Sequence, residues 1–277
     1  MKLTGFNLDG VRHIGAIEDS KVRDLGTVAT FYEDTTAGLA SQGGDLHDLD
    51  ALELAPAVPE TARIFCVGIN YRSHAGESKD LAGIDEPKVP MVFGRWQQSL
   101  VIDGVPVPVP PNEPGLDWEV ELAVVMSDRV WRADEDTAME HVLGYAAFND
   151  LSARTKQLET PQFTLGKNAD RSGPISSVVT KDEVGDIAAG LRVTTEVNGE
   201  VMQEGNTRDL IHSVGRIISY ITDTLTLLPG DVIATGTPGG VGAGRKPQIF
   251  LQAGDEVVVT VDSVGSVRNP IVADVPR

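Results

Sequence analysis

The strongest constraint on this chain is a short run of alternating acidic and apolar residues, Asp117-Trp118-Glu119-Val120-Glu121-Leu122. Side chains two apart on a strand point to the same side, so Asp117, Glu119 and Glu121 are expected to line one face. Carboxylates about 7 Å apart repel one another unless water or a cation screens them. The run therefore predicts either a solvated outer face of a strand or a site for a divalent metal.

A second apolar segment supplies another candidate carboxylate, because residues 142–149 read as a buried strand and Asp150 follows directly. With Glu119 and Glu121 it can complete a three-carboxylate cluster of the kind that hard, oxygen-seeking cations prefer. No histidine or cysteine adjoins these acids in the sequence, which disfavours zinc and favours Mg²⁺ or Mn²⁺. Three carboxylates and a divalent ion leave one negative charge, which Lys167 could cancel.

The charge balance narrows the choice of partner. Lys and Arg number 23 against 41 Asp and Glu, for a net charge of −18. This argues against nucleic acid and anionic membrane surfaces, both of which need clustered basic residues. No stretch approaches the roughly 20 apolar residues of a membrane span, and the first residues lack the apolar region of a signal peptide. The sequence predicts a cytoplasmic protein with a small-molecule substrate.

The chain is expected to have a small β-rich N-terminal domain over residues 1–60 and a main domain over residues 61–277. Strands are predicted at 11–17 and 21–25, and short strands dominate after residue 63. The best helical pattern covers residues 210–221, where apolar residues recur at helical spacing. The single cysteine, Cys66, lies in an apolar run and is expected to be a buried structural thiol.

A glycine-rich stretch over residues 234–247 could suggest a nucleotide-binding loop. It fails that test, because no Gly-Lys-Ser/Thr sequence is present and Pro247 closes the segment where a helix would have to begin. Two interpretations remain open: a loop whose backbone amides approach a small anion, or an ordinary wide loop.

His74 and Glu77 are three residues apart, so a helical turn would make them neighbours. A carboxylate beside an imidazole can orient the ring and support its charged form, as a general base requires. A solvated pair on a surface turn is the alternative interpretation.

Taken together in this order, the segments resemble the fumarylacetoacetate hydrolase family, in particular its acylpyruvase and fumarylpyruvate hydrolase-like branch. The match runs from about residue 63 to 272, and the motifs lie at 67–71 with His74 and Glu77, and at 117–125, 149–154, 165–167, 203–207, 230–238 and 268–270. The resemblance implies an α+β, mostly β fold, a mixed β-sandwich roll with few helices, and a homodimer.

The resemblance also implies roles for individual residues. By motif match these are Mg²⁺ (or Mn²⁺) ligands at Glu119, Glu121 and Asp150, catalytic roles for Lys167 and for His74 and Glu77 on a lid over bound substrate, and contacts to substrate oxygens from Gln157 and Thr237.

Two departures from the family pattern concern the substrate. A Lys-Pro pair often follows the strand equivalent to residues 91–93, whereas this chain has Arg95 there, and Arg95 is predicted to bind a distal carboxylate of the substrate. Ile69 stands where some acylpyruvate-cleaving relatives have an arginine. These changes leave the predicted metal site intact and leave the substrate open.

The expected activity is metal-dependent hydrolysis of a C–C bond in a ketonic substrate, a 2,4-dioxo acid of the acylpyruvate or fumarylpyruvate type. The metal would stabilise the enolate that leaves, and the His74–Glu77 pair would activate water. The alternatives are oxaloacetate decarboxylation or isomerisation of a 2-hydroxy-diene-dioate at the same site. A catalytically silent binding protein with the same fold is the alternative from another class.

Overall fold

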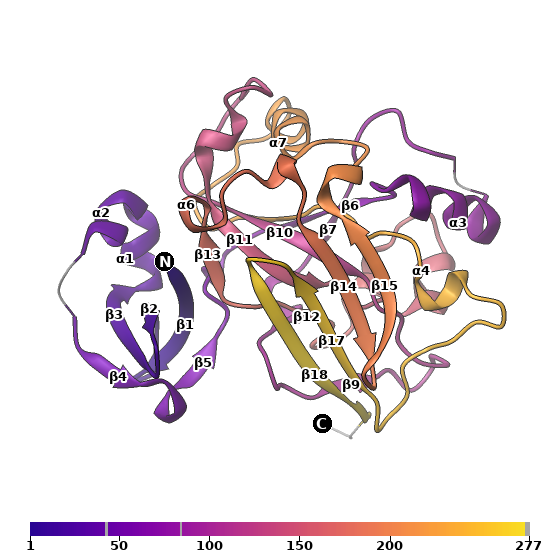
Figure 1. Ribbon diagram of the computed structural model, residues 1–277, viewed down its shortest axis with the longest axis horizontal. Helices are drawn as coiled ribbons and strands as arrows, with labels where there is room; N and C mark the ends of the chain where they lie inside the picture. Colours follow the sequence, from indigo (N-terminus) through magenta and orange to yellow (C-terminus); the bar gives the residue numbers. More distant parts are fainter. Residues whose placement is uncertain (42–43, 84, 275–277) are drawn as a thin grey trace.

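The computed structural model describes residues 1–41, 44–83 and 85–274. Within these ranges a large mixed sheet runs through most of the molecule (Figure 1). In spatial order its strands are β4 (Leu46–Asp48), β3 (Lys21–Thr27), β2 (Val11–Glu18), β1 (Lys2–Leu8), β13 (Val178–Thr180), β11 (Val142–Asn149), β10 (Val120–Met126), β16 (Val232–Ala234), β6 (Ile64–Gly68) and β7 (Met91–Arg95), with β5 (Glu53–Ala55) paired to β1.

A second sheet packs against the middle of the first. Two further short strands form a small sheet of their own. The second sheet has the order β15 (Glu200–Asn206), β14 (Arg192–Val197), β17 (Glu256–Val261), β18 (Gly265–Ala273) and β9 (Val107–Val109), and the pair is β12 (Gly173–Pro174) with β8 (Leu100–Val101).

The helices are short. The α-helices are α1 (Val28–Glu33), α2 (Thr35–Ala40), α3 (Arg72–Ala82), α4 (Arg154–Leu158), α5 (Thr164–Lys167), α6 (Lys181–Val184) and α7 (Val214–Thr222), and the 3₁₀ turns are η1 (Leu49–Ala51), η2 (Gln97–Ser99), η3 (Ala138–His141), η4 (Ile187–Ala189), η5 (Thr207–Asp209) and η6 (Gly242–Gly244). The predicted α+β, mostly β class is confirmed. Among the described residues, no helix has the length and apolar character needed to cross a membrane.

The first 60 residues form a lobe beside the main body, at the left of Figure 1. The strands predicted at 11–17 and 21–25 are present as β2 and β3, but the sequence did not reveal β1. β1 pairs with β13, with Leu3 opposite Val178, so the lobe extends the large sheet without a break. A boundary at residue 60 stays a prediction.

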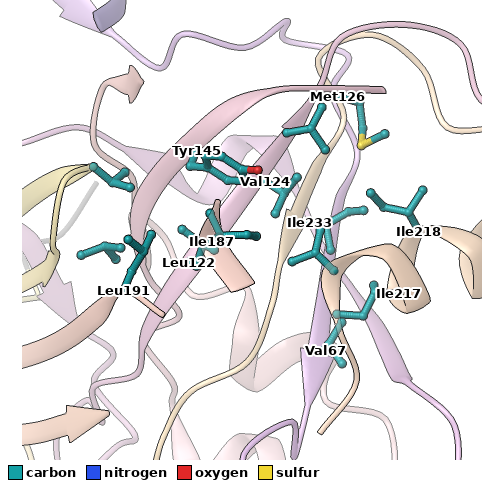
Figure 2. Packing of buried hydrophobic residues seen from close by; sticks show 14 of the residues in the cluster. Val67, Leu122, Val124, Met126, Tyr145, Ile187, Leu191, Ile217, Ile218 and Ile233 are labelled. Carbon is teal, nitrogen blue, oxygen red and sulfur yellow. The ribbon is translucent and has the colours of Figure 1, made fainter. Parts of the chain in front are cut away.

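Strand β10 is buried on both faces, and this fixes the orientation of its side chains. Val120, Leu122 and Val124 belong to the core between the two sheets, which α7 closes with Ile217 and Ile218 (Figure 2). The intervening Ala123 and Val125 face a second core toward the N-terminal lobe. The alternation read from the sequence is therefore real, but both of its faces are interior.

The helix predicted at 210–221 is present, but it begins later, at Val214. Ser213 ends the preceding loop, and its hydroxyl accepts a hydrogen bond from the Arg216 amide at 3.0 Å, an N-cap arrangement. Leu210 lies outside the helix because it pairs with Tyr71 in an isolated bridge.

Truncating Ile217 tests the packing of α7 against the sheet. This side chain is fully buried, so Ile217→Ala is expected to lower the free energy of unfolding by about 2–5 kcal/mol. Urea denaturation measures the change, and Ser219→Ala on the half-buried side of the same helix is the matched control. Equal stability of the two variants would contradict this packing.

Candidate metal and active site

Three buried carboxylates meet at the ends of two neighbouring strands in the middle of the large sheet. Strands β10 and β11 are antiparallel, with Val120 opposite Asn149, so the start of β10 lies beside the end of β11. Glu119 and Glu121 come from the first of these ends and Asp150 from the second. Each offers an oxygen atom, and these atoms all lie within 4.8 Å of one another, the one such cluster found in the described ranges. The expected convergence is present, and it is buried, not solvated.

Lys167 holds two of the three acids together. Its Nζ atom donates to Glu119 Oε2 at 2.7 Å and to Asp150 Oδ2 at 2.6 Å. Burial alone raises the pKa of Glu119, but Lys167, Arg154 and His74 outweigh burial and hold this pKa at about 2. Burial lowers the pKa of Lys167, and the two carboxylates outweigh it, so the net shift is upward. Both groups are therefore charged at neutral pH.

Glu121 lacks such a partner. Its Oε2 atom accepts a hydrogen bond from the Gly236 amide at 2.8 Å, and no described cationic side chain forms an ion pair with it. Burial, Asp150 and Glu119 together raise the pKa of Glu121 well above the ordinary value. An all-oxygen donor set with one uncompensated carboxyl fits a divalent cation. Glu119, Glu121 and Asp150 are the residues that could hold it.

Asp117 is not part of the three-carboxylate cluster, although it belongs to the same alternating segment as Glu119 and Glu121. This fully buried carboxylate accepts hydrogen bonds from the Gly242 amide at 2.6 Å, the Ala243 amide at 2.9 Å and Arg154 Nε at 2.8 Å. The glycine-rich loop thus directs its amides at anions, which are carboxylates of the protein itself, whereas the binding of a small anion by this loop stays a prediction.

His74 and Glu77 lie on α3, which docks on the same loop. His74 Nδ1 is 3.2 Å from Glu77 Oε2, and Glu77 Oε1 accepts from the Gly240 amide at 2.7 Å. Ser73 Oγ accepts from the Gly239 amide at 3.0 Å. The expected pair is formed, and His74 is only 8% exposed. The mobility of α3 as a lid stays a prediction.

One cavity is lined by Glu119 and Glu121, by His74 and by several apolar residues. Of the predicted site residues, Gln157 and Thr237 also line it: Gln157 Oε1 accepts from Arg154 at 2.8 Å, and Thr237 Oγ1 accepts from Gln203 at 2.9 Å. The lining residues are Val67, Gly68, Ile69, His74, Phe93, Glu119, Glu121, Arg154, Gln157, Leu158, Phe163, Lys167, Thr237 and Ala243.

Arg95 does not line this cavity, contrary to the role expected for it. Its Nε atom donates to Asp150 Oδ1 at 2.9 Å, one terminal nitrogen donates to Ser172 and Ser99, and the other donates to Asp150 and the Leu151 carbonyl. All five N–H donors of the guanidinium are engaged. In this arrangement Arg95 positions Asp150 and has no donor left for a substrate carboxylate.

The sequence alone gave no role to two residues of the site, Arg154 and Gln203. Arg154 lines the cavity and pairs with both Asp117 and Glu119. Gln203 Nε2 donates to Thr237 Oγ1, and Gln203 Oε1 accepts from the Val120 amide at 3.1 Å, so this residue of β15 ties the second sheet to β10. Both lie inside motifs that the sequence displays, but their partners come from distant segments.

A model of the fumarylacetoacetate (FAA) hydrolase C-terminal domain matches residues 63–272. The chain belongs to the fumarylacetoacetate hydrolase family. One relative of this chain is 2,4-didehydro-3-deoxy-L-rhamnonate hydrolase of Sphingomonas sp. (strain SKA58). It is 38% identical over 98% of this chain and 96% of its own length. Oxaloacetate tautomerase FAHD2A, mitochondrial, of Bos taurus is 38% identical over 98% of this chain and 86% of its own.

Solved structures agree with the fold of this fumarylacetoacetate hydrolase family protein. A putative HpcE protein from Mycobacterium smegmatis superposes with a TM-score of 0.85 at 34% identity, covering 99% of this chain and 100% of its own. 2-Hydroxyhepta-2,4-diene-1,7-dioate isomerase from Mycobacterium marinum gives a TM-score of 0.80 at 29% identity and covers 100% of both chains. The names of the relatives thus span hydrolase, tautomerase and isomerase activities.

Removing one carboxylate tests the metal site. Asp150→Ala is expected to abolish measurable binding of Mg²⁺ and Mn²⁺, because it removes one of three converging ligands and leaves Arg95 unpaired. Isothermal titration calorimetry measures the affinity. Glu159→Ala, which removes an exposed acid near α4, is the matched control. Unchanged affinity after Asp150→Ala would assign the ion elsewhere.

The raised pKa of Glu121 predicts that metal binding releases a proton. A divalent cation needs the carboxylate form, whereas burial beside Asp150 and Glu119 favours the protonated form of the metal-free protein. The apparent Mg²⁺ affinity is therefore expected to rise with pH and to level off above this raised pKa. Calorimetry in buffers of different ionisation enthalpy counts the protons released. A constant affinity at every pH above the ordinary glutamate pKa would refute the coupling.

Proposed function

We propose that this enzyme hydrolyses the bond between C3 and C4 of a 2,4-dioxo acid of the acylpyruvate type, with Mg²⁺ or Mn²⁺ as its cofactor. The observation that carries the proposal is one cavity that is lined both by Glu119 and Glu121 of the three-carboxylate cluster and by His74 of the His74–Glu77 pair. The cluster could hold a divalent cation, and His74 is a general base already oriented by the carboxylate of Glu77. The homodimer implied by the resemblance and the cytoplasmic location expected from the sequence stay predictions.

The acid end of the cavity fits the 2-oxo acid part of the substrate. A bound divalent cation would act there as a Lewis acid that stabilises the negative charge developing on the 2-oxo group. Lys167 adds a second positive charge beside Glu119 and Asp150. Arg154 and Gln157 lie in the same wall and offer donors to substrate oxygens.

His74 is placed to activate water at the other carbonyl. Because Glu77 engages Nδ1, Nε2 is the ring atom left to accept a proton. Water adds to C4 as His74 takes its proton, and the C3–C4 electron pair leaves as the enolate of pyruvate. The enolate then gains a proton at C3, so the products are pyruvate and a carboxylic acid.

The names of two relatives favour different reactions at such a site. The Sphingomonas name describes a sugar acid with oxo groups at C2 and C4, which is a 2,4-dioxo acid, and calls the enzyme a hydrolase. The Bos taurus name describes tautomerisation of oxaloacetate, which needs proton transfer but no water. Tautomerisation or isomerisation of a 2-oxo acid is therefore the second candidate, and it would use the same acids and the same base.

Replacing the base separates these activities. With acetylpyruvate as substrate, His74→Ala is expected to lower kcat for pyruvate release by about 10²–10⁴-fold, the usual contribution of a general base. Mg²⁺ affinity should stay unchanged, because His74 is not among the clustered ligands. His141→Ala, at a histidine outside the cavity that pairs with Asp128, is the control.

The same preparations are assayed for enol–keto conversion of oxaloacetate. Pyruvate release from acetylpyruvate by the parent enzyme supports hydrolysis. Conversion of oxaloacetate without any pyruvate release from dioxo acids would favour the tautomerase instead. Parental hydrolysis by His74→Ala would remove His74 as the base.

A further inference from the structure

Ile69 adopts a backbone conformation that is unfavourable for its type. Its φ angle is 55°, in the left-handed region, where a β-branched residue is a genuine outlier. The next residue holds it there. Asn70 is fully buried, donates to the carbonyls of Thr235 at 2.8 Å and His212 at 3.0 Å, and accepts from the His212 amide at 2.7 Å. A strained conformation fixed so firmly indicates a function for the residue that carries it.

The core does not explain why an isoleucine occupies this position. Ile69 is only 5% exposed, yet it belongs to none of the three apolar clusters found among the described residues. Ile69 lines the cavity instead. Glycine would adopt the same φ without strain, so the isoleucine side chain, and not the backbone, is what this position requires.

The sheet separates the backbone of Ile69 from that of Glu121. Ile69 follows β6, which lies two strands from β10 in the order β10-β16-β6, so two strand spacings, together about 10 Å, lie between the two backbones across the sheet. The apolar residues Val67, Phe93 and Phe163 also line the cavity.

No lysine or arginine side chain of the described cavity lining is free to pair with a substrate carboxylate beside Ile69. Arg154 is paired with Asp117 and Glu119. Lys167 is paired with Glu119 and Asp150. Arg95 is outside the cavity, and all its donors are engaged. A carboxylate placed beside Ile69 would be desolvated without a partner, which is costly.

We propose that Ile69 is a specificity-determining residue that selects an uncharged, apolar acyl group on C4 of the dioxo acid. The inference rests on the proposed function, and it reverses the preference for diacids expected from Arg95. The apolar wall binds the alkyl or aryl end of the substrate, while the acids and Lys167 bind the 2-oxo acid end.

A matched pair of substrates tests this proposal. Butanoylpyruvate and succinylpyruvate share one carbon skeleton, and only the second ends in a carboxylate. The parent enzyme with Mg²⁺ is expected to show a kcat/KM about 10-fold or more in favour of butanoylpyruvate, as expected for a charge left unpaired. Ile69→Gly, which is free of strain but lacks the wall, should reduce this ratio by about 10-fold. Ile69→Asn, which tolerates the same φ but is polar, should reduce it as well.

The ratio compares two substrates on one preparation, so a smaller folded fraction leaves it unchanged. Ser263→Gly is the control, because it removes a residue with φ 63° in the turn between β17 and β18, outside the cavity. Its ratio should equal that of the parent. Equal efficiency of the parent on both substrates, or an unchanged ratio in both Ile69 variants, would overturn the proposal.

If the proposed hydrolysis is wrong, the same two compounds give a different result. If the parent cleaves neither compound, C–C hydrolysis is refuted. The ratio of the dissociation constants of the same two compounds, measured by calorimetry with Mg²⁺ present, then decides the role of Ile69. A parental ratio that favours the uncharged compound and falls in Ile69→Gly supports the apolar wall, and equal constants refute it.

Discussion

The site depends on three carboxylates buried at the ends of β10 and β11. Their burial is possible because basic side chains of the protein pair with them. Lys167 is 2% exposed and donates to both Glu119 and Asp150. Removing one partner of such a buried pair leaves an uncompensated charge, which costs more than the pair itself contributes. Arg95 pairs with Asp150 and Arg154 with Glu119, so Glu121 is the acid left for an added cation.

The glycine-rich loop connects this cluster to the base. Its amides donate to Glu121 through Gly236, to Asp117 through Gly242, and to Glu77 through Gly240. An added Cβ at Gly242 would lie 1.9 Å from the Ile249 carbonyl, so the loop has no room for a side chain there. One loop therefore sets the position of an acid of the three-carboxylate cluster and the position of the carboxylate that lies beside His74.

Much of this could be predicted from the sequence, because the decisive signals are local. Alternation along residues 117–122 predicted the acidic face, and the strand before Asp150 predicted the third acid. The partner of Arg95 could not be predicted, because Asp150 and Ser172 approach it only in the folded chain. Burial of β10 on both faces was also missed, since residues of the N-terminal lobe complete a second core on the face that the pattern left open to water. The left-handed backbone of Ile69 gives no signal in an apolar run.

The division of the cavity also bears on how one fold carries several reactions. Cleavage, tautomerisation and isomerisation of 2-oxo acids all require charge stabilisation at the 2-oxo group and a base, and both requirements are met by residues held at the strand ends and by the glycine loop. What differs between such substrates is the group beyond the two oxo groups. In this chain Ile69, Phe93 and Phe163 line the cavity, and their side chains supply no hydrogen bond. A wall of this kind selects the substrate without altering the charged end, so substrate preference and chemistry can change separately.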